Sequence, residues 1–291
     1  MQERIGFIGL GAMGGPVAAR LAAHGWKVTG FDTDRARAAA VRGIELAGDP
    51  AGVVAAADIL FTCLPNEPAV EAVLGAVAKP GLLLIDLSTI RPTTARRLHD
   101  ELKARGVAHV ECPMLKGAAE AAAGTLFLIV SGEPQDVERL KPFLPLIGSE
   151  HRIVGGPGAA SRIKTVQNGL GLVQMCAIAE ALAMIAADGG DLGAFIEVVG
   201  AGGGMAATPL FRAKAPLMRD PNAKALGSLH IGAKDSALAA DLATDLGLDL
   251  PLFERSALLY RRAMAAGLAH ADVAAVARMV ETETGVQLAK G

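Results

Sequence analysis

The stretch Ile5-Gly6-Phe7-Ile8-Gly9-Leu10-Gly11-Ala12-Met13-Gly14-Gly15 decides the fold of this chain of 291 residues. A short apolar run passes directly into the pattern Gly9-x-Gly11-x-x-Gly14, and residues 16–24 then predict a helix. An apolar segment over residues 26–31 follows and ends at Asp32. A strand, a glycine loop, a helix and an acidic residue in this order are typical of a unit that binds a dinucleotide. The alternative is an ordinary glycine-rich turn in another kind of α/β protein.

The glycine motif predicts how a cofactor would be held. Its first glycine allows the tight turn, its second lets the backbone approach a pyrophosphate, and its third lets the helix pack closely on the strand. The pyrophosphate would accept hydrogen bonds from N–H groups at the helix start, where the helix dipole favours negative charge. We therefore predict that the cofactor-binding loop consists of Gly9, Leu10, Gly11, Ala12, Met13 and Gly14.

Asp32 predicts which dinucleotide is bound. A carboxylate at the end of the second strand accepts hydrogen bonds from the adenosine ribose hydroxyls and repels a 2′-phosphate. The following residues, Thr33 and Asp34, supply no guanidinium for such a phosphate. We therefore expect NAD rather than NADP. Asp32 could also be the N-cap of the next helix, and the two roles are compatible.

Composition excludes several classes of protein. The net charge of -2 gives no reason to expect a nucleic-acid partner. Three dispersed cysteines and six histidines without ligand spacing predict neither a disulfide framework nor a metal site, and they fit a reducing, cytoplasmic compartment. The N-terminus runs directly into a strand, and no uninterrupted apolar run reaches the roughly 18 residues that span a bilayer. We therefore expect no membrane association.

The pattern of apolar residues changes halfway along the chain. The first half alternates short apolar runs with helical segments, which is typical of a doubly wound parallel sheet. From Ser161 onward only helical periodicity remains, beginning with one long helix to Ala187. We therefore predict a Rossmann-type, NAD-binding α/β domain over residues 1–160. An all-helical domain for substrate binding or oligomerisation would follow over residues 161–291, starting with a long interdomain helix.

The expected elements can be given by residue range. Beyond the glycine motif, we expect strands at 59–64, 82–86, 109–112, 127–130 and near 152, with helices at 35–42, 67–77, 93–105 and 135–144. In the second domain we expect helices near 192–199, 207–218, 231–246, 252–266 and 271–282. The segments Leu64-Pro65 and Ser88-Thr89 follow successive strands, at the edge where parallel sheets bind ligands. Ser88 and Thr89 could instead cap the next helix.

Lys164 and Asn168 are four residues apart on the long helix and so share one face. Asparagine is a poor residue for a helix interior, and the nearby Gly169 and Gly171 each cost about 1 kcal/mol relative to alanine. Such residues suggest that something approaches this face closely. A desolvated lysine has a lowered pKa and can serve as an acid or base. The alternative is a solvated surface lysine, and the pair Lys234-Asp235 could likewise be exposed charges.

Taken together, these segments give the chain a family resemblance. The whole sequence resembles the β-hydroxyacid dehydrogenases, which include 3-hydroxyisobutyrate dehydrogenase and the tartronate semialdehyde and glyoxylate reductases and are related to 6-phosphogluconate dehydrogenase. The resemblance rests on residues 9–14, 86–90, 111–125, 158–168 and 234–239, with Leu250-Pro-Leu252 and Tyr260 following at similar spacing.

The resemblance implies both an activity and a set of roles. It implies an NAD-dependent oxidoreductase that interconverts a 3-hydroxyacid and its semialdehyde or keto acid by hydride transfer. Lys164 would be the general acid and base, and Asn168 would position the substrate. Thr89 and Lys234 would line the nicotinamide end, Leu64 and Pro65 would touch the cofactor, and no metal would be needed.

The substrate loop departs from the family pattern. Members typically carry Ser-Gly-Gly where this chain has Leu115, Lys116 and Gly117. A hydroxyl donor is lost and a cation is gained, which suggests a larger or doubly anionic substrate such as a dicarboxylate or a sulfonate. Alternatively, Lys116 points to solvent and backbone amides alone bind the substrate. Gln167 also stands where many members have an asparagine.

Two other functions are compatible with this fold. One is imine reduction, and the other is a noncatalytic dinucleotide-binding scaffold. Related imine reductases usually lack the lysine, and a scaffold would not require it, so Lys164 argues against both. We expect a small anionic hydroxyacid or semialdehyde as the partner. The apolar helical domain also suggests a homo-oligomer, either a dimer or a tetramer.

Overall fold

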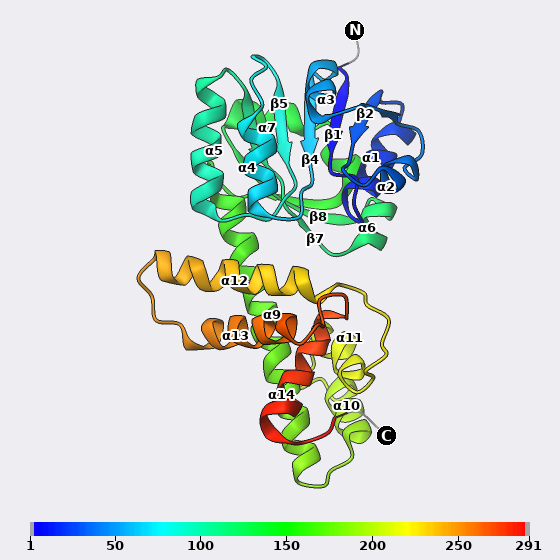
Figure 1. The fold of residues 1–291 in the computed structure, drawn as a ribbon, viewed down its shortest axis with the longest axis vertical. Helices are drawn as coiled ribbons and strands as arrows, with labels where there is room; N and C mark the ends of the chain where they lie inside the picture. The colour runs from blue at the N-terminus through cyan, green and yellow to red at the C-terminus, as the bar shows by residue number, and fades with distance from the viewer. Residues whose placement is uncertain (1–2, 289–291) are drawn as a thin grey trace. The chain divides into compact units, whose positions relative to one another are not determined.

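The chain divides between Thr165 and Val166 into two compact units, each with its own hydrophobic core. The structure, a computed structural model, describes residues 3–288 (Figure 1). The division falls within helix α9 (Ala159–Ala187), which begins in the first unit and continues into the second. The predicted boundary after residue 160 lies five residues earlier, near the start of this helix. The tasks assigned to the two domains stay predictions.

The described part of the first unit is built on a nine-stranded sheet with the order β3-β2-β1-β4-β5-β6-β8-β7, and β9 pairs with β8. From β3 to β6 all neighbouring strands are parallel, in the doubly wound order of a dinucleotide-binding fold. These strands are β1 (Ile5–Ile8), β2 (Val28–Phe31), β3 (Glu45–Leu46), β4 (Ile59–Thr62), β5 (Leu83–Asp86) and β6 (Ala108–Glu111). The Rossmann-type prediction is confirmed.

One part of the sheet is not parallel. Strand β8 (Leu126–Gly132) runs antiparallel to both β6 and the short β7 (Met114–Leu115), and β9 (Gly148–Ile153) runs parallel to β8. A parallel crossover normally carries a helix across the face of the sheet. Here the connection holds only β7 and the six-residue helix α6 (Ala118–Ala123), so the chain turns back on itself.

Helices cover both faces of the parallel strands, because alternate side chains point to opposite faces. Phe7, Phe61 and Ile85 belong to one buried layer, and Leu60 and Leu84 belong to the other. The first layer includes residues of α1 (Gly14–Ala23), α2 (Arg35–Ala39), α7 (Pro134–Leu140) and α8 (Leu144–Ile147). The second includes residues of α3 (Pro50–Ala56), α4 (Glu67–Gly75) and α5 (Pro92–Ala104). Burial on both faces explains the continuous apolar runs of β1, β4 and β5.

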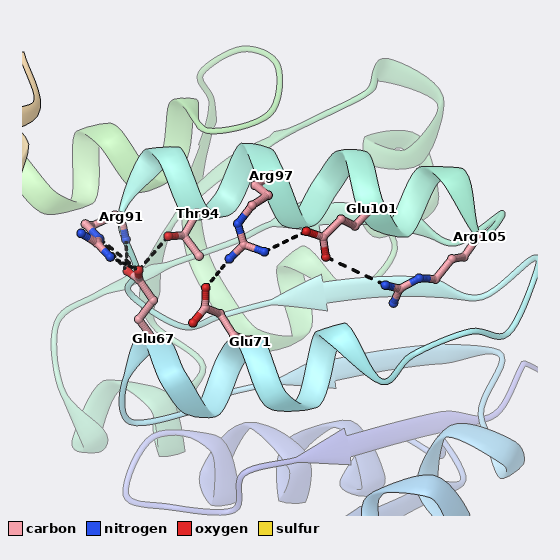
Figure 2. A network of polar contacts seen from close by, with 7 residues as sticks. All are labelled: Glu67, Glu71, Arg91, Thr94, Arg97, Glu101 and Arg105. Atoms are coloured by element: carbon pink, nitrogen blue, oxygen red, sulfur yellow. Dashed lines mark hydrogen bonds and ion pairs between the residues drawn. The ribbon is translucent and has the colours of Figure 1, made fainter.

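A polar network joins α4 to α5 on the outside of the second layer (Figure 2). The Glu67 carboxylate accepts hydrogen bonds from the Arg91 backbone N–H (3.0 Å), from the Arg91 guanidinium and from Thr94 Oγ1 (2.7 Å). Burial would raise the pKa of Glu67, but these hydrogen bonds lower it below its ordinary value. Arg91 is the N-cap residue of α5 and has no side-chain cap of its own. The alternative that Ser88 or Thr89 is the N-cap of α5 is therefore wrong, and Glu67 instead holds the N-cap residue Arg91 from the neighbouring helix.

The second unit is all helical in its described residues apart from one isolated bridge, as predicted. Its core joins Met175 and Leu182 of α9 to Tyr260. By length and composition alone α9 could cross a membrane, but its apolar residues contribute to this core, as in many core helices. The other helices are α10 (Leu192–Ala201), α11 (Pro209–Met218), α12 (Leu229–Asp245), α13 (Pro251–Ala265), the 3₁₀ helix η1 (Val273–Val276) and α14 (Ala277–Thr284).

A buried histidine on β6 predicts that the first unit is sensitive to acid. His109 is fully buried, and its ring lies 5.9 Å from that of His99 on α5. Burial, reinforced by His99, lowers the pKa of His109 to about 3. Between that value and its ordinary pKa of about 6.5, only the unfolded chain binds the proton, so this histidine favours unfolding increasingly as pH falls.

We expect His109→Leu to remove this sensitivity. Urea unfolding at pH 7 and pH 4.5 should show that the original protein loses about 2–3 kcal/mol more of its free energy of unfolding than the variant does. An equal loss in both proteins would mean that His109 titrates normally. Comparing the two proteins cancels the contributions of the many carboxylates.

Candidate functional site

The glycine loop lies where the strand order reverses, between β1 and β4. Gly9 has a φ of 95°, and a Cβ on it would lie 2.2 Å from the carbonyl oxygen of Cys63. A Cβ on Gly14 would lie 2.0 Å from the carbonyl oxygen of Gly9. These two glycines are therefore required by the packing of the backbone itself. Ligands bind at this switch point in open α/β sheets.

Gly11 differs from its two neighbours in the motif. A Cβ at this position would meet no described atom closer than Arg37 Nη1, at 3.8 Å. The packing of the protein therefore does not require a glycine here, and the space beside Gly11 fits the close approach of a pyrophosphate. Helix α1 begins at Gly14, and Met13 provides no side-chain cap. The helix N-terminus can thus serve an anionic ligand.

Asp32 ties the end of β2 to the glycine loop. Its carboxylate accepts one hydrogen bond from the Leu10 N–H (2.7 Å) and one from the Asp34 N–H (2.8 Å), each at a different oxygen. Each carboxylate oxygen has two lone pairs, so acceptor capacity is left for ribose hydroxyls. The N-cap of α2 is Asp34, which accepts from the Arg37 N–H (3.0 Å). The alternative in which Asp32 is that N-cap is therefore wrong.

A buried network links the ends of β4 and β5. Thr62 Oγ1 (2.8 Å) and the Ser88 N–H (3.0 Å) both donate to the Asp86 carboxylate, and the Leu64 N–H donates to Ser88 Oγ (2.9 Å). Burial raises the pKa of Asp86. The network holds half-buried Leu64 next to exposed Pro65, and Ser88 next to Thr89, at the edge where the glycine loop lies. The sequence reasoning missed Asp86 and Thr62, although polar residues ending apolar strands were a usable signal.

The predicted substrate loop follows β6. Lys116 is exposed and has a φ of 77°, a left-handed conformation that favours glycine, and its Nζ donates to the Thr125 carbonyl (2.6 Å). The Gly117 N–H donates to Glu120 Oε2 (3.0 Å) at the start of α6. Leu115, the last residue of β7, is half-buried. One of the backbone amides considered for substrate binding is thus already used within the loop.

Lys164 lies against this loop. Its side chain is half-buried, and its Nζ donates to the Met114 carbonyl oxygen at 2.7 Å. This contact belongs entirely to the first unit. Lys164 is therefore not the freely solvated surface lysine that the sequence left as an alternative.

In the second unit, Asn168 and Lys234 both contact the carboxylate of Asp235. Asn168 Nδ2 donates to Asp235 Oδ2 (2.7 Å), and Lys234 Nζ forms an ion pair with Asp235 Oδ1 (3.1 Å). Asp235 is buried, so the alternative of simply exposed charges is wrong. Asp235 was missed as a site residue, although its pairing with Lys234 in the sequence pointed to it.

Of the two glycines near Asn168, the packing of the helices explains Gly169 but not Gly171. A Cβ on Gly169 would lie 2.4 Å from Ala239 Cβ, so this glycine lets α9 pack closely on α12. The close approach that Gly169 suggests is therefore that of α12. Gly171 has no described atom within 4 Å of its Cβ position.

Comparisons with known proteins place the chain in a family. Residues 4–156 match the NAD binding domain of 6-phosphogluconate dehydrogenase. Residues 158–280 match the NAD-binding region of NADP-dependent 3-hydroxyisobutyrate dehydrogenase. The chain belongs to the β-hydroxyacid dehydrogenase family. Its predicted resemblance, its fold and its class as an NAD-binding oxidoreductase are thereby confirmed.

Several members of the β-hydroxyacid dehydrogenase family match along almost their whole length. The chain is 31% identical to 2-(hydroxymethyl)glutarate dehydrogenase of Eubacterium barkeri, covering 99% of this chain and 98% of the relative. It is 31% identical to 3-sulfolactaldehyde reductase of Escherichia coli, covering 97% of each. A solved structure of Mycobacterium tuberculosis 3-hydroxyisobutyrate dehydrogenase with L-serine has 30% identity and a TM-score of 0.83, covering 96% of this chain and 99% of that one.

Proposed function

We propose that this dehydrogenase uses NAD to interconvert a small anionic hydroxyacid and its semialdehyde or keto acid, with Lys164 as the general acid and base. The observation that carries the proposal is the 2.7 Å contact between Lys164 Nζ and the Met114 carbonyl. This contact holds an ionisable group at the loop that bears Leu115, Lys116 and Gly117. The family membership and the names of its relatives support the reaction class.

The proposed cofactor site consists of Gly9, Leu10, Gly11, Ala12, Met13, Gly14, Asp32, Leu64, Pro65, Thr89 and Lys234. When bound, NAD supplies or accepts a hydride at its nicotinamide ring. Asp32 would accept hydrogen bonds from the ribose hydroxyls, because its oxygens keep acceptor capacity beside the N–H groups of Leu10 and Asp34. The same carboxylate would repel a 2′-phosphate, so we propose NAD over NADP.

Lys164 would move the proton that accompanies the hydride. In oxidation the neutral amine would take the hydroxyl proton, and in reduction the ammonium would give a proton to the carbonyl oxygen. Asn168 stands four residues further along α9 and is held through its amide nitrogen by Asp235. This hydrogen bond leaves the amide oxygen of Asn168 to accept from a substrate hydroxyl. The lysine is also what separates this proposal from imine reduction and from a noncatalytic scaffold.

A turnover screen tests the proposed function. The purified protein would be assayed with NAD(H) and NADP(H) against 3-hydroxyisobutyrate, L-serine, 2-(hydroxymethyl)glutarate, 3-sulfolactaldehyde and a cyclic imine. We expect turnover of at least one hydroxyacid or aldehyde, with kcat/KM at least about 10-fold higher for NAD(H) than for NADP(H) because of Asp32. Turnover of the imine alone, or turnover of none with tight NADH binding, would contradict the dehydrogenase proposal. Preference for NADPH would contradict the role of Asp32.

We further propose that Lys116 binds a second anionic group of the substrate. Its hydrogen bond to the Thr125 carbonyl uses one of three N–H donors, and the exposed ammonium keeps the others. Lys116→Ala should raise KM for a dicarboxylate or sulfonate about 10-fold and leave KM for a monocarboxylate nearly unchanged. Lys116→Gly is the matched control, because glycine removes the same charge without the backbone cost at φ 77°. Unchanged KM values in both variants would contradict this role.

The cellular setting is proposed on simpler grounds. We propose a cytoplasmic protein, because Cys63, Cys112 and Cys176 all lie in the described residues and form no disulfide. We also propose a dimer or tetramer, since exposed Met184, Val198 and Leu252 leave apolar surface on the second unit. Sedimentation at several protein concentrations tests the oligomer.

A further inference from the structure

The start of α9 has no cap of its own. Gly158 precedes the helix with a φ of 85°, and a Cβ there would lie 2.7 Å from Arg96 Cγ. A glycine has no side-chain oxygen to accept from the first helical N–H groups. These groups must therefore find acceptors elsewhere, because buried N–H groups without partners are costly.

A carboxylate from the sheet supplies most of the acceptors. Glu111 is the last residue of β6 and is only 3% exposed. Its Oε1 accepts from the Gly158 N–H, and its Oε2 accepts from the Ser161 N–H (3.1 Å) and the Ser161 hydroxyl. Every hydrogen bond in this set crosses about 50 residues of sequence. Glu111 thus fastens the beginning of α9 to the end of a central strand.

Ser131, on β8, completes the arrangement. Its hydroxyl donates to Glu111 Oε1 (3.1 Å) and accepts from the Ala160 N–H (3.0 Å). The remaining N–H group of the first turn, on Ala159, donates to the Gly156 carbonyl (3.2 Å). All four N–H groups that an α-helix leaves without internal partners are therefore satisfied.

The same two segments meet a second time, three residues further along each. The first contact joins Glu111 to Ser161. Three residues further along each segment, the Met114 carbonyl accepts a hydrogen bond from Lys164. We propose that Glu111 is a positioning residue, which fixes α9 against the loop 112–117 so that the Lys164 amine is held at a set place beside that loop. This inference rests on the proposed role of Lys164. Glu111 itself need not touch substrate or cofactor.

The chemistry at this position requires a carboxylate. Glu111 accepts four hydrogen bonds and donates none. A carboxylate has about four acceptor positions on two oxygens, whereas a glutamine would turn an NH₂ group toward N–H and O–H donors. Negative charge at a helix N-terminus also interacts favourably with the helix dipole. Glu111→Gln should therefore break the hydrogen bonds to one of the two carboxylate oxygens while changing the shape of the side chain very little.

The test uses Glu111→Gln in the full chain, with two readouts that need no turnover. Amide hydrogen exchange should become at least about 10-fold faster in residues 158–164 and stay unchanged in α5. Labelling of Lys164 by pyridoxal phosphate and borohydride, followed by peptide mass mapping, should change at least about threefold in rate. Asp49→Asn is the matched control, because Asp49 caps α3 through the Gly52 N–H (2.7 Å) in the same unit. It should leave both readouts unchanged.

Turnover gives the third readout, on whichever substrate the screen identifies. Glu111→Gln should lower kcat at least about 10-fold with the NADH Kd within about twofold, and Glu111→Asp, which keeps the charge, should recover part of kcat. Val53→Ala, which leaves a cavity in the second core layer, controls for lost stability alone. If Glu111→Gln does not fold, Ser131→Ala removes one acceptor and is measured in the same way.

The outcomes separate the two proposals. If Glu111→Gln exchanges amide hydrogens and labels Lys164 at the same rates as the unsubstituted protein, the positioning role is overturned. A loss of kcat no larger than that of Val53→Ala would overturn it as well. If the screen finds no turnover, the proposed function fails, while exchange and labelling still decide whether Glu111 holds Lys164 in place.

Discussion

Lys164→Ala is expected to lower kcat by about three orders of magnitude while leaving the NADH Kd within about twofold. General acid–base catalysis by a positioned side chain contributes typically 10²–10⁴-fold, and removing the amine removes that contribution. Cofactor affinity should survive because the proposed nucleotide contacts lie at the glycine loop and Asp32, whereas Lys164 Nζ donates to the Met114 carbonyl. Steady-state kinetics and NADH fluorescence titration measure the two quantities.

Two control variants sharpen this result. Lys164→Arg keeps a cation and a donor for the Met114 carbonyl but cannot give up its proton near neutral pH, so its kcat should be nearly as low. Lys103→Ala removes an exposed lysine that pairs with Glu133, and it should leave kcat unchanged. Full turnover by Lys164→Ala would remove the lysine from the mechanism.

Gly9→Ala is expected to lose about 2–4 kcal/mol of the free energy of unfolding, and with it a stable cofactor site. The φ of 95° strains any residue with a Cβ, and that atom would lie 2.2 Å from the Cys63 carbonyl oxygen. Thermal unfolding should show a clear drop in Tm. NADH should bind at least about 100-fold more weakly, because the displaced loop no longer presents its N–H groups.

Gly11→Ala provides the contrast. Its Cβ would have 3.8 Å of space beside the nearest described atom, so the Tm should change little. NADH binding should still weaken at least about 10-fold, because the methyl group fills the space that the pyrophosphate would need. A Tm for Gly9→Ala equal to that of Gly11→Ala would contradict the packing argument. Unchanged NADH binding in Gly11→Ala would contradict the placement of the cofactor.

Local patterns were enough to predict much of the fold. The strand, glycine loop and helix around Gly9, the buried runs of β4 and β5, and the helical second unit all depend on residues close in sequence. The short strand β3 and helices α3 and α6 were not predicted, because two to seven residues carry too little periodicity. The direction of β8 depends on how the chain returns after β6, which no local pattern specifies.

The candidate site divides in the same way. The glycine loop and Asp32 follow a fixed spacing, so they could be predicted together. The contacts of Glu111 with Ser161 and of Asp235 with Asn168 could not, because each pair lies 50 or 67 positions apart in the chain. Gly169 indicated a close approach from the sequence, but only the structure shows that the approaching element is α12. Sequence spacing therefore identified the candidate site residues, but their hydrogen-bond partners come from contacts between distant parts of the chain.

The left-handed backbone at Lys116 has a consequence for how this protein can evolve. Glycine at that position would relieve roughly 1 kcal/mol of strain, so a single substitution would make the fold more robust and erase the cation at once. With the proposed role of Lys116 in substrate binding, thermal tolerance and substrate choice are opposed at this position. A search for heat-resistant variants should recover Lys116→Gly early, and lineages that keep the lysine must draw the missing stability from elsewhere in the chain.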